Sequence, residues 1–401
     1  MKIAVIAPTE IPARRANTLQ VMKMSQAFQE LGHQVITLVP CSSQGISPDS
    51  DRARSWESLA HHYGLKHPLN IEWMAAHKNL RRYDFSWRAL KRAQNWGSQI
   101  IYTRLPQTAA IASLTGFPTI FEIHDYPQGK IGPFLLRTFL SGRGARRLVV
   151  ITRTLHDDLS ANFQIPAEKN FTIIAPDGVD IKRYQDLPDP LQARKQLSSN
   201  PSPNISKNIR YPENFVSQFT AGYSGHLYPG RGTQLLLEMA AQLPHINFLI
   251  VGGEPQDVIR LQQAADQHNL KNFLLPGFIP NSELPSLQAA CDVLLMPYQE
   301  KVSASSGGNI ARYLSPMKLF EYMACRRAIL SSNLPVLQEI LNAQNSVLLP
   351  PKDVQSWVNA INHLLANPEL CDRLAKQARQ DVTQFTWQAR AVRILDGIKY
   401  S

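Results

Sequence analysis

Two charged residues stand in an otherwise apolar, helix-like segment near the C-terminal end of the chain. Lys318 and Glu321 are three residues apart, so on a helix they share a face. Ser315 and Pro316 suit the start of such a helix, because Ser is a good N-cap and Pro fits the first helical position. A lysine beside exposed N–H groups attracts an anion, and a glutamate one turn later can accept hydrogen bonds from sugar hydroxyls. The pair suits a nucleotide diphosphate with its ribose; from this segment alone, an ordinary salt bridge on an amphipathic helix is the alternative.

A second candidate for phosphate binding is the glycine-rich stretch from Gly225 to Gly232. It follows an apolar, strand-like run and precedes a helical pattern that starts near Thr233. Glycines let backbone N–H groups approach an anion closely, and Arg231 within the stretch can make a bidentate contact to phosphate. A plain strand-to-helix turn is the alternative, and the presence of Arg231 favours phosphate.

Three further strand-like runs end in residues that could line a binding site. Gly253 follows one run, and Phe278 follows another, where it could border a nucleobase or belong to the core. His124 stands beside Asp125 at the end of a third run, and a structural histidine inside a loop is its alternative role. Ligands of parallel sheets bind at the carboxyl ends of the strands, so all three positions are candidates.

Short apolar runs alternate with helical patterns along the chain. The runs are 3–7, 35–39, 71–75, 100–103, 119–123, 148–151 and 171–175, then 220–223, 247–251, 272–275, 293–296, 328–331 and 346–349. This alternation predicts parallel sheets covered on both faces, and two successive series predict two doubly wound α/β domains. The first helix is expected to start at a capping box of Asn17 and Gln20 and to stop at Gly32. No G-x-G-x-x-G follows the first run, so NAD is not favoured.

The composition of the chain divides it into four parts. We expect an N-terminal α/β domain over residues 1–185 and a linker with an insertion over 186–214, which is rich in Pro, Ser and Asn. A second α/β domain should span 215–383, and a last helix over 384–401 must pack somewhere on the chain.

The net charge of +11 falls mainly on the N-terminal half of the 401-residue chain. Lys and Arg gather within residues 78–92 and 137–147, which could contact anionic lipid or be solvated surface. Nucleic acid is disfavoured, because no nucleic-acid motif accompanies the charge. Four unpaired Cys and no 18-residue apolar stretch favour a cytoplasmic protein, peripheral at the inner face of the membrane if the lipid contact exists.

These motifs occur in an order that resembles glycosyltransferase family 4, the group 1 type of retaining enzyme with the GT-B fold of two facing Rossmann-like domains. The similarity covers essentially the whole chain. The motifs that carry it are 124–125, 175–180, 225–232, 251–253, 276–278, 315–324 and 385–387. The resemblance implies that a Rossmann-like domain over 1–185 binds the acceptor, that a second one over 215–383 binds the nucleotide sugar, and that the helix over 384–401 packs back on the first domain. It also implies a deep cleft between the two domains.

The resemblance also assigns roles to residues. It implies that Arg231 binds the donor diphosphate, that Glu321 contacts the ribose and that His124 lies near the transferred sugar, while the backbone around Lys318 and Leu319 approaches the phosphates. Expected catalytic residues are His124, Arg231, Lys318 and Glu321. Expected donor-binding residues are Gly225, His226, Arg231, Gly232, Gly253, Phe278, Lys318, Leu319 and Glu321, and expected acceptor-binding residues are Asn17, Thr18 and Arg104.

The chain departs from the family pattern at three places. The first Glu of the family's paired motif, which usually holds sugar hydroxyls, would fall at Tyr313. The Arg that usually follows the first glycine is His226, so Arg231 and Lys318 must compensate more of the phosphate charge. Residues 14–18 replace the family's Gly-Gly loop before the first helix.

We therefore expect a retaining glycosyltransferase that moves a hexose-type sugar from a UDP- or GDP-sugar to a glycan, lipid-linked or small-molecule acceptor, as in polysaccharide or glycolipid biosynthesis. Arg231, Lys318 and helix N-termini would stabilise the leaving diphosphate, so neither a metal nor another cofactor is expected. The alternatives are an isomerase similar to nucleotide-sugar 2-epimerases and a non-catalytic binder of sugar nucleotides.

Overall fold

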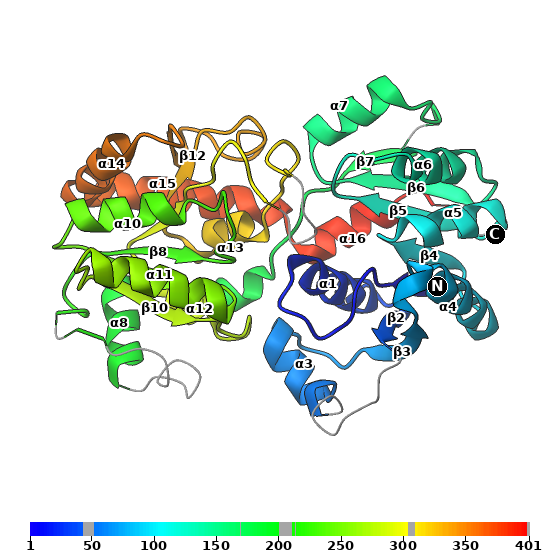
Figure 1. Cartoon of the computed structure of the whole chain (residues 1–401), viewed down its shortest axis with the longest axis horizontal. Coiled ribbons are helices and arrows are strands. Elements are labelled where there is room, and N and C mark those ends of the chain that lie inside the picture. The colour runs from blue at the N-terminus through cyan, green and yellow to red at the C-terminus, as the bar shows by residue number, and fades with distance from the viewer. Residues whose placement is uncertain (43–51, 169, 200–210, 213, 304–308, 399–401) are drawn as a thin grey trace. The chain divides into compact units, whose positions relative to one another are not determined.

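The computed structural model describes residues 1–42, 52–168, 170–199, 211–212, 214–303 and 309–398. The chain divides into two compact units: unit 1 comprises Met1–Asp177 with Trp387–Ser401, and unit 2 comprises Gly178–Thr386. Each unit is a parallel sheet with helices packed on both of its faces (Figure 1). The expected pair of doubly wound α/β domains is confirmed.

Unit 1 is built on a seven-stranded sheet of order β3-β2-β1-β4-β5-β6-β7. The strands are β1 (Lys2–Ile6), β2 (Gln34–Ser42), β3 (Asn70–Ala76), β4 (Ile100–Thr103), β5 (Thr119–Ile123), β6 (Ala145–Val150) and β7 (Thr172–Ile174). The helices are α1 (Ala16–Glu30), α3 (Trp56–Tyr63), α4 (Tyr83–Trp96), α5 (Pro106–Leu114), α6 (Ile131–Ser141), α7 (Arg153–Asn162) and α16 (Trp387–Leu395), with a 3-10 turn η1 (Lys78–Leu80). The strand order reverses between β1 and β4, which marks the topological switch point of this unit.

Unit 2 has the same architecture as unit 1, with a six-stranded sheet of order β10-β9-β8-β11-β12-β13. The strands are β8 (Thr220–Ser224), β9 (Asn247–Val251), β10 (Phe273–Gly277), β11 (Val293–Met296), β12 (Ala328–Ser332) and β13 (Val347–Leu349). The helices are α8 (Pro190–Ser199), α10 (Thr233–Gln242), α11 (Pro255–Gln267), α12 (Leu284–Ala289), α13 (Met317–Cys325), α14 (Val354–Ala366) and α15 (Pro368–Asp381), with 3-10 turns η2 (Ile181–Tyr184) and η3 (Val382–Gln384). Its switch point lies between β8 and β11.

Both faces of the second sheet are buried, which explains why its strands are continuous apolar runs. In β9, Leu249 packs into the cluster on one face and Ile250 into the cluster on the other. Because successive strand residues point to opposite faces, a strand covered on both sides needs apolar residues at every position. The same argument applies to central strands such as β1, β4 and β11, and every run that the sequence predicted overlaps a strand.

The structure divides the chain after Asp177 and after Thr386, where the sequence suggested divisions at 185, 214 and 383. Residues that follow Asp177 already belong to unit 2, since the Val179 N–H donates to the Phe385 carbonyl at 2.9 Å. Residues 190–199 of the expected linker form α8, whose Arg194 pairs with Asp292 at 2.7 Å. Helix α16 lies against α1 within unit 1.

Two predicted helix starts are wrong by one or two residues. Helix α1 begins at Ala16 with Arg15 at the N-cap, so Asn17 lies inside the first turn and the expected capping box with Gln20 does not form. Helix α13 begins at Met317 with Pro316 at the N-cap. In both cases the side chain at the N-cap makes no capping hydrogen bond, so neither helix start is satisfied by the usual Ser, Thr or Asp.

Candidate functional site

The glycine-rich loop of unit 2 follows β8 at the switch point of the sheet. Gly225 has a φ of +140°, and a Cβ atom there would lie 2.6 Å from the Lys318 Nζ atom. Gly232, with a φ of +81°, is the N-cap of α10, and a Cβ atom there would clash with the Pro297 carbonyl. Glycine is therefore required at both positions, and the loop brings the start of α10 and the start of α13 to the same sheet edge.

Lys318 is buried in a cage of aromatic rings. Its Nζ atom lies 3.6 Å from the centroid of the Tyr223 ring and 5.4 Å from that of Tyr298, and no hydrogen-bond partner for it exists among the described residues. Burial, together with the charge of Arg231, lowers the pKa of Lys318 well below its ordinary value. A buried ammonium with aromatic rings beside it and no hydrogen-bond or ion-pair partner among the described residues is a group prepared for an anionic ligand.

Arg231 shares the Tyr298 ring with Lys318. Its guanidinium carbon lies 5.1 Å from the centroid of that ring, and its buried Nε atom has no hydrogen-bond partner in the described part of the chain. Neither α10 nor α13 carries an acidic residue in its first turn. Two cations and two helix N-termini thus meet, and the charge of Glu321, which favours the protonated form of Lys318, does not outweigh burial and the charge of Arg231. This arrangement favours phosphate.

Glu321 lies one turn into α13, held by two amide side chains. Asn281 Nδ2 is 3.4 Å from one carboxylate oxygen, and Gln288 Nε2 is 3.4 Å from the other. Arg183 in turn donates to the Asn281 side-chain oxygen at 2.5 Å. Since each carboxylate oxygen carries two lone pairs, Glu321 keeps acceptor capacity for hydroxyl groups.

The other expected donor-binding residues occupy three different settings. The His226 ring stacks on that of Tyr228 with centroids 4.6 Å apart. Gly253 packs closely against the Leu227 side chain, and Leu319 is buried in the core beneath α13. Phe278 is half-buried just after β10 and belongs to neither core cluster of unit 2, which leaves a nucleobase contact open.

In unit 1, His124 follows β5 and is bonded to the carboxylate of Glu122 through its Nε2 atom. Glu122 is fully buried and also accepts from Arg390 of α16, at 2.8 Å from Nη2 and 3.1 Å from Nη1. Burial alone would raise the pKa of the Glu122 carboxyl, but Arg390 and His124 outweigh burial and hold it well below the ordinary value. Burial and the charge of Arg104 lower the pKa of His124.

The three expected acceptor-binding residues lie close to the start of α1 and the end of β4. Arg104 donates to Gln20 Oε1 at 3.2 Å. The Asn17 Oδ1 atom is buried without a hydrogen-bond partner among the described residues. The Thr18 hydroxyl donates to the carbonyls of Ala13 and Arg15, each at 2.8 Å, and so supports the backbone before the helix.

Glu122, His124 and Asp177 each bring a potential metal ligand within 4.8 Å of one another. Arg390 donates a hydrogen bond to Glu122 of this cluster, and the charge of Arg104 lowers the pKa of His124. The positive charges of two guanidinium groups therefore act on the residues that would bind a metal. Both would repel a divalent cation, so the cluster does not suit a metal. The chain's Asp-x-Asp triplet at 49–51 lies outside the described residues.

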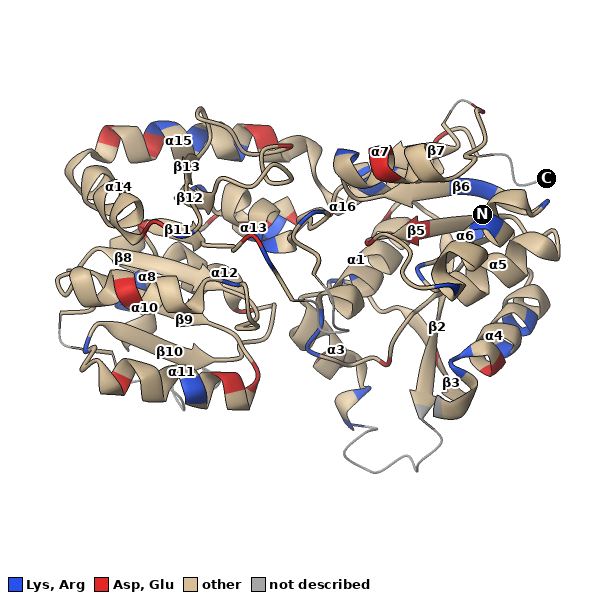
Figure 2. Cartoon of the chain, turned by 45° about the horizontal axis from the view of Figure 1, so that its top comes forward, with Lys and Arg blue, Asp and Glu red and all other residues tan. Residues whose placement is uncertain are grey.

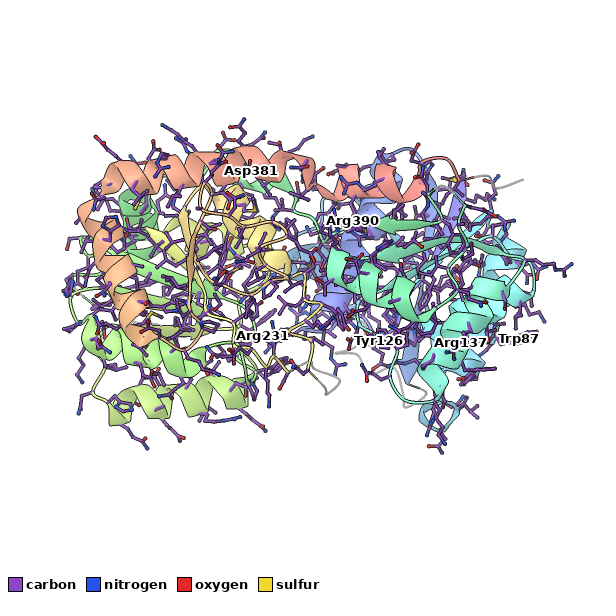
Figure 3. All side chains as sticks on the ribbon, turned by 90° about the horizontal axis from the view of Figure 1, so that it is seen from above. Trp87, Tyr126, Arg137, Arg231, Asp381 and Arg390 are labelled. Atoms are coloured by element: carbon purple, nitrogen blue, oxygen red, sulfur yellow. The ribbon has the colours of Figure 1, made fainter. Side chains whose placement is uncertain are left out.

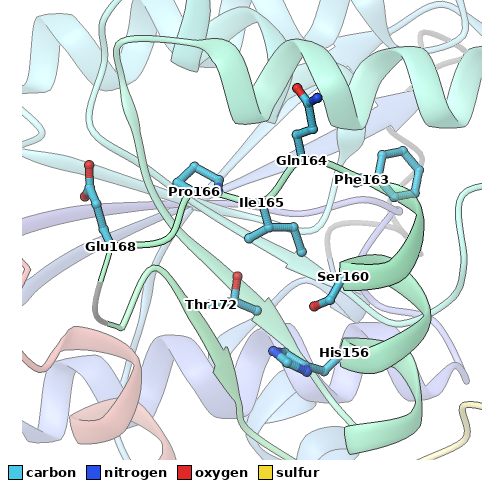
Figure 4. Close-up of a pocket in the computed structure, with 8 residues that line it drawn as sticks. All are labelled: His156, Ser160, Phe163, Gln164, Ile165, Pro166, Glu168 and Thr172. Atoms are coloured by element: carbon cyan, nitrogen blue, oxygen red, sulfur yellow. The ribbon is translucent and has the colours of Figure 1, made fainter.

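A pocket of about 440 Å³ opens on unit 1 beside α7 (Figure 4). Its lining includes His156, Ser160, Phe163 and Thr172, from α7, the loop that follows it and β7. None of the residues expected in a site lines it. The pocket is therefore separate from the residues discussed above.

Sequence reasoning missed Glu122 and Arg390 as functional residues. One signal was a single acid in the apolar run Thr119–Ile123. The other was a single arginine on the buried face of α16, which it shares with Trp387, Ala391 and Ile394. Charged residues at such positions are buried and must pair with each other.

Two family models match the chain. The model described as "Glycosyl transferases group 1" matches residues 206–381, and the model described as "Glycosyltransferase Family 4" matches residues 19–183. Together they cover most of both units.

Individual proteins are similar over nearly the full length. A phosphatidyl-myo-inositol mannosyltransferase of Mycolicibacterium smegmatis is 20% identical and covers 98% of this chain and 92% of its own. Sucrose-phosphate synthase from Thermosynechococcus elongatus superposes with a TM-score of 0.72 at 17% identity, covering 98% of this chain and 97% of its own. Anabaena HepE, solved in complex with UDP-glucose, gives a TM-score of 0.70 at 16% identity, covering 99% and 98%.

Proposed function

The chain is a group 1 glycosyltransferase of family 4 with the GT-B fold, and we propose that it transfers a hexose-type sugar from a UDP- or GDP-sugar to a glycan, lipid-linked or small-molecule acceptor, with retention. The observation that carries the donor half of this proposal is the pair of cations Lys318 and Arg231, which stand over the Tyr298 ring with no ion pair among the described residues. A nucleoside diphosphate supplies the missing negative charge.

The chemistry of the transfer follows from the charge of the leaving group. The bond between the anomeric carbon and the diphosphate breaks, and the acceptor hydroxyl oxygen bonds to the same face of the sugar, so the configuration is retained. The hydroxyl proton passes to the departing diphosphate. Negative charge grows on the diphosphate as it leaves. Fixed cations and helix N-termini stabilise that charge without reorganising, so we propose that Lys318, Arg231 and the starts of α10 and α13 do this without a metal.

Different residues contact the ribose and the transferred sugar in this proposal. Glu321 accepts hydrogen bonds from the ribose hydroxyls, and its amide neighbours Asn281 and Gln288 support it there. His124 contributes to the transfer step and not to nucleotide binding. The complex of Anabaena HepE with UDP-glucose supports a nucleotide-sugar donor for a chain of this fold.

A panel of nucleotide sugars tests the proposal. UDP-, GDP- and ADP-sugars are added to the full chain, and the melting temperature is followed, because a ligand that binds only the folded state raises it. We expect one base to stabilise the chain and its sugar nucleotide to be consumed with release of the nucleoside diphosphate. Formation of an epimeric sugar nucleotide without an acceptor would indicate an isomerase instead, and no shift with any base would contradict the donor site.

For the acceptor side we propose a peripheral, salt-sensitive contact of unit 1 with an anionic membrane at its cytoplasmic face. Large apolar side chains project from α4 and α6: Trp87 is 61% exposed and Phe134 is 64% exposed. The same two helices carry exposed basic residues, Lys91 on α4 and Arg137 on α6. Figure 2 marks basic residues along α4, and Figure 3 labels Trp87 and Arg137. Aromatic and cationic side chains together suit anionic headgroups.

Part of the expected basic surface does not exist. Arg147 is buried and donates to the carbonyls of Ile394 and Asp396, each at 2.6 Å, because it closes the C-terminal end of α16. Arg92 is paired with Glu72 at 2.6 Å. No helix in the described part of the chain is both long and apolar enough to cross a bilayer.

A further inference from the structure

The carboxylate of Glu122 accepts hydrogen bonds from four side chains of unit 1. Besides Arg390 and His124, it accepts from Gln20 Nε2 at 2.7 Å and from the Tyr102 hydroxyl. Its side chain has no exposed surface. A buried carboxylate with this many donors is ionised and fixed in one orientation, because any rotation would leave several donors unpaired.

Arg390 holds that carboxylate from the far end of the chain. Its side chain is 2% exposed, and beyond Glu122 it donates to the carbonyl of Pro176 at 2.9 Å and to that of Ala175 at 3.1 Å. The guanidinium is therefore anchored to the segment after β7 as well as to β5 (Arg390 is labelled on α16 in Figure 3). Through Arg390, helix α16 thus fixes the orientation of the Glu122 carboxylate, which is bonded to His124.

The bond between Glu122 and His124 determines which imidazole nitrogen carries the proton. An ionised carboxylate can only accept, so Nε2 of His124 must donate. Since burial and Arg104 lower the pKa of His124, the ring is neutral and has one N–H group. Nδ1 is then an acceptor. No described residue is bonded to Nδ1, and the side chain keeps 18% of its surface exposed.

We propose that Glu122, anchored by Arg390, is the positioning residue of His124: it holds the imidazole as the Nε2–H tautomer, so that Nδ1 accepts a hydrogen bond from a hydroxyl of the sugar substrate. An acceptor nitrogen binds hydroxyl groups and repels phosphate oxygens, so His124 selects the sugar part of the donor or the acceptor. The identity of the substrate rests on the proposed function, but the tautomer does not.

The tautomer can be measured without any substrate. The full chain is labelled with ¹⁵N-histidine, and the ring nitrogens are observed by two-bond ¹H–¹⁵N correlation at pH 7.5, with the His124 signals assigned from their loss in His124→Asn. We expect a protonated Nε2 and an unprotonated Nδ1. A protonated Nδ1, or a doubly protonated ring, would overturn the proposal.

Glu122→Gln tests the role of the carboxylate. Arg390 donates to both oxygens of Glu122, and His124 shares one of them with Arg390 and Gln20. A Gln replaces one of these acceptors with an NH₂ group and removes the negative charge that holds the Nε2–H proton, so the preference for this tautomer should weaken. We expect a larger fraction of Nδ1–H together with an at least tenfold loss of UDP release from UDP-glucose and unchanged affinity for UDP. A folded variant whose His124 signals stay as in the native chain would overturn the positioning role.

Two variants keep the test decisive. If Glu122→Gln does not fold, Glu122→Asp withdraws the carboxylate by one methylene, and the Nε2–H preference should weaken; an unchanged spectrum then counts against the proposal. Glu72→Gln, which removes the pair with Arg92, is the matched control and should leave His124 unaffected. If the tautomers behave as expected but no sugar nucleotide is turned over, the positioning stands and the proposed function fails.

Discussion

The Lys318 ammonium lies 3.6 Å from the centroid of the Tyr223 ring, and both residues border Gly225. Tyr223 is the last residue but one of strand β8, and Lys318 lies in the first turn of α13, so two separate elements bring the ring and the ammonium together. The absence of a side chain at Gly225 gives the ammonium its space. The glycine-rich loop therefore makes room for the lysine that the sequence identified. Because the ammonium of Lys318 is buried there, its protonation is sensitive to a bound ligand.

Nucleotide binding should therefore take up protons. Burial and Arg231 lower the pKa of Lys318 in the free chain, and a bound diphosphate would raise it again, so the bound state holds more protons in the interval between the two values. Affinity should fall as the pH rises through that interval. Calorimetry with UDP or GDP in buffers of different ionisation enthalpy measures the uptake, which Lys318→Met should abolish while weakening binding by roughly 10- to 150-fold. Equal enthalpies in all buffers would contradict this account of Lys318.

Glu321→Ala should weaken donor binding or turnover by tens- to about a thousand-fold, since a charged hydrogen-bond acceptor in a site contributes on the order of 2–4 kcal/mol. The fold should survive, because Glu321 is partly exposed and its neighbours Asn281 and Gln288 can bond elsewhere. Initial rates and near-UV circular dichroism check both points. Glu238→Ala, on the exposed side of α10, is the control; an unfolded or fully active Glu321→Ala would return this residue to a structural role.

The sequence predicted the fold well because the central strands of both sheets are buried on two faces. These strands had to be apolar runs, and short runs such as 293–296 could be recognised from local pattern alone. Helix starts were less predictable. Arg15 and Pro316 occupy N-cap positions without making a capping bond, so the residue types that normally signal a helix start were absent from both positions.

The candidate site was predictable only where its residues lie close together in sequence. Lys318 and Glu321 share a helix, and Gly225 and Arg231 share a loop, so spacing revealed them. The link between Glu122 and Arg390 joins positions 268 residues apart, and nothing local in either segment points to the other. The same holds for Tyr298, whose position beneath both Arg231 and Lys318 depends on the packing of three elements.

Arg147→Ala should destabilise unit 1 by about 2–4 kcal/mol without a direct effect on the site. The guanidinium donates to the carbonyls of Ile394 and Asp396 at the end of α16 and to that of Asn170, and these acceptors would lose a buried partner. Urea unfolding followed by circular dichroism measures the loss. Arg146→Ala, a half-buried neighbour that bonds only local carbonyls, should change stability by less than about 0.5 kcal/mol. Equal effects of the two substitutions would contradict the closing role of Arg147.

Arg231→Ala and His124→Ala should separate nucleotide binding from turnover. Arg231 belongs to the cation pair of unit 2, so its loss should weaken binding of the bare nucleoside diphosphate by roughly tenfold or more. We have proposed that His124 contacts the sugar in the transfer step, so its loss should cut turnover by roughly 10- to 100-fold and leave nucleotide affinity nearly intact. Isothermal titration with UDP or GDP measures the nucleotide affinity of both variants. If His124→Ala weakens nucleotide binding as much as Arg231→Ala does, this division of roles is wrong.

Binding to anionic vesicles should depend on both the apolar and the basic side chains of α4 and α6. We expect the full chain to co-sediment with phosphatidylglycerol vesicles at low salt and to be released as the ionic strength rises, because exposed charges are screened beyond about 8 Å at 0.15 M salt. Trp87→Ala combined with Phe134→Ala should reduce binding at every salt concentration, since it removes large apolar groups that insert between headgroups. Ile259→Ala, an equally exposed residue of unit 2, is the control and should bind as the native chain does. Failure of the native chain to bind even at low salt would leave these side chains as ordinary surface and direct the search for acceptors to water-soluble glycans.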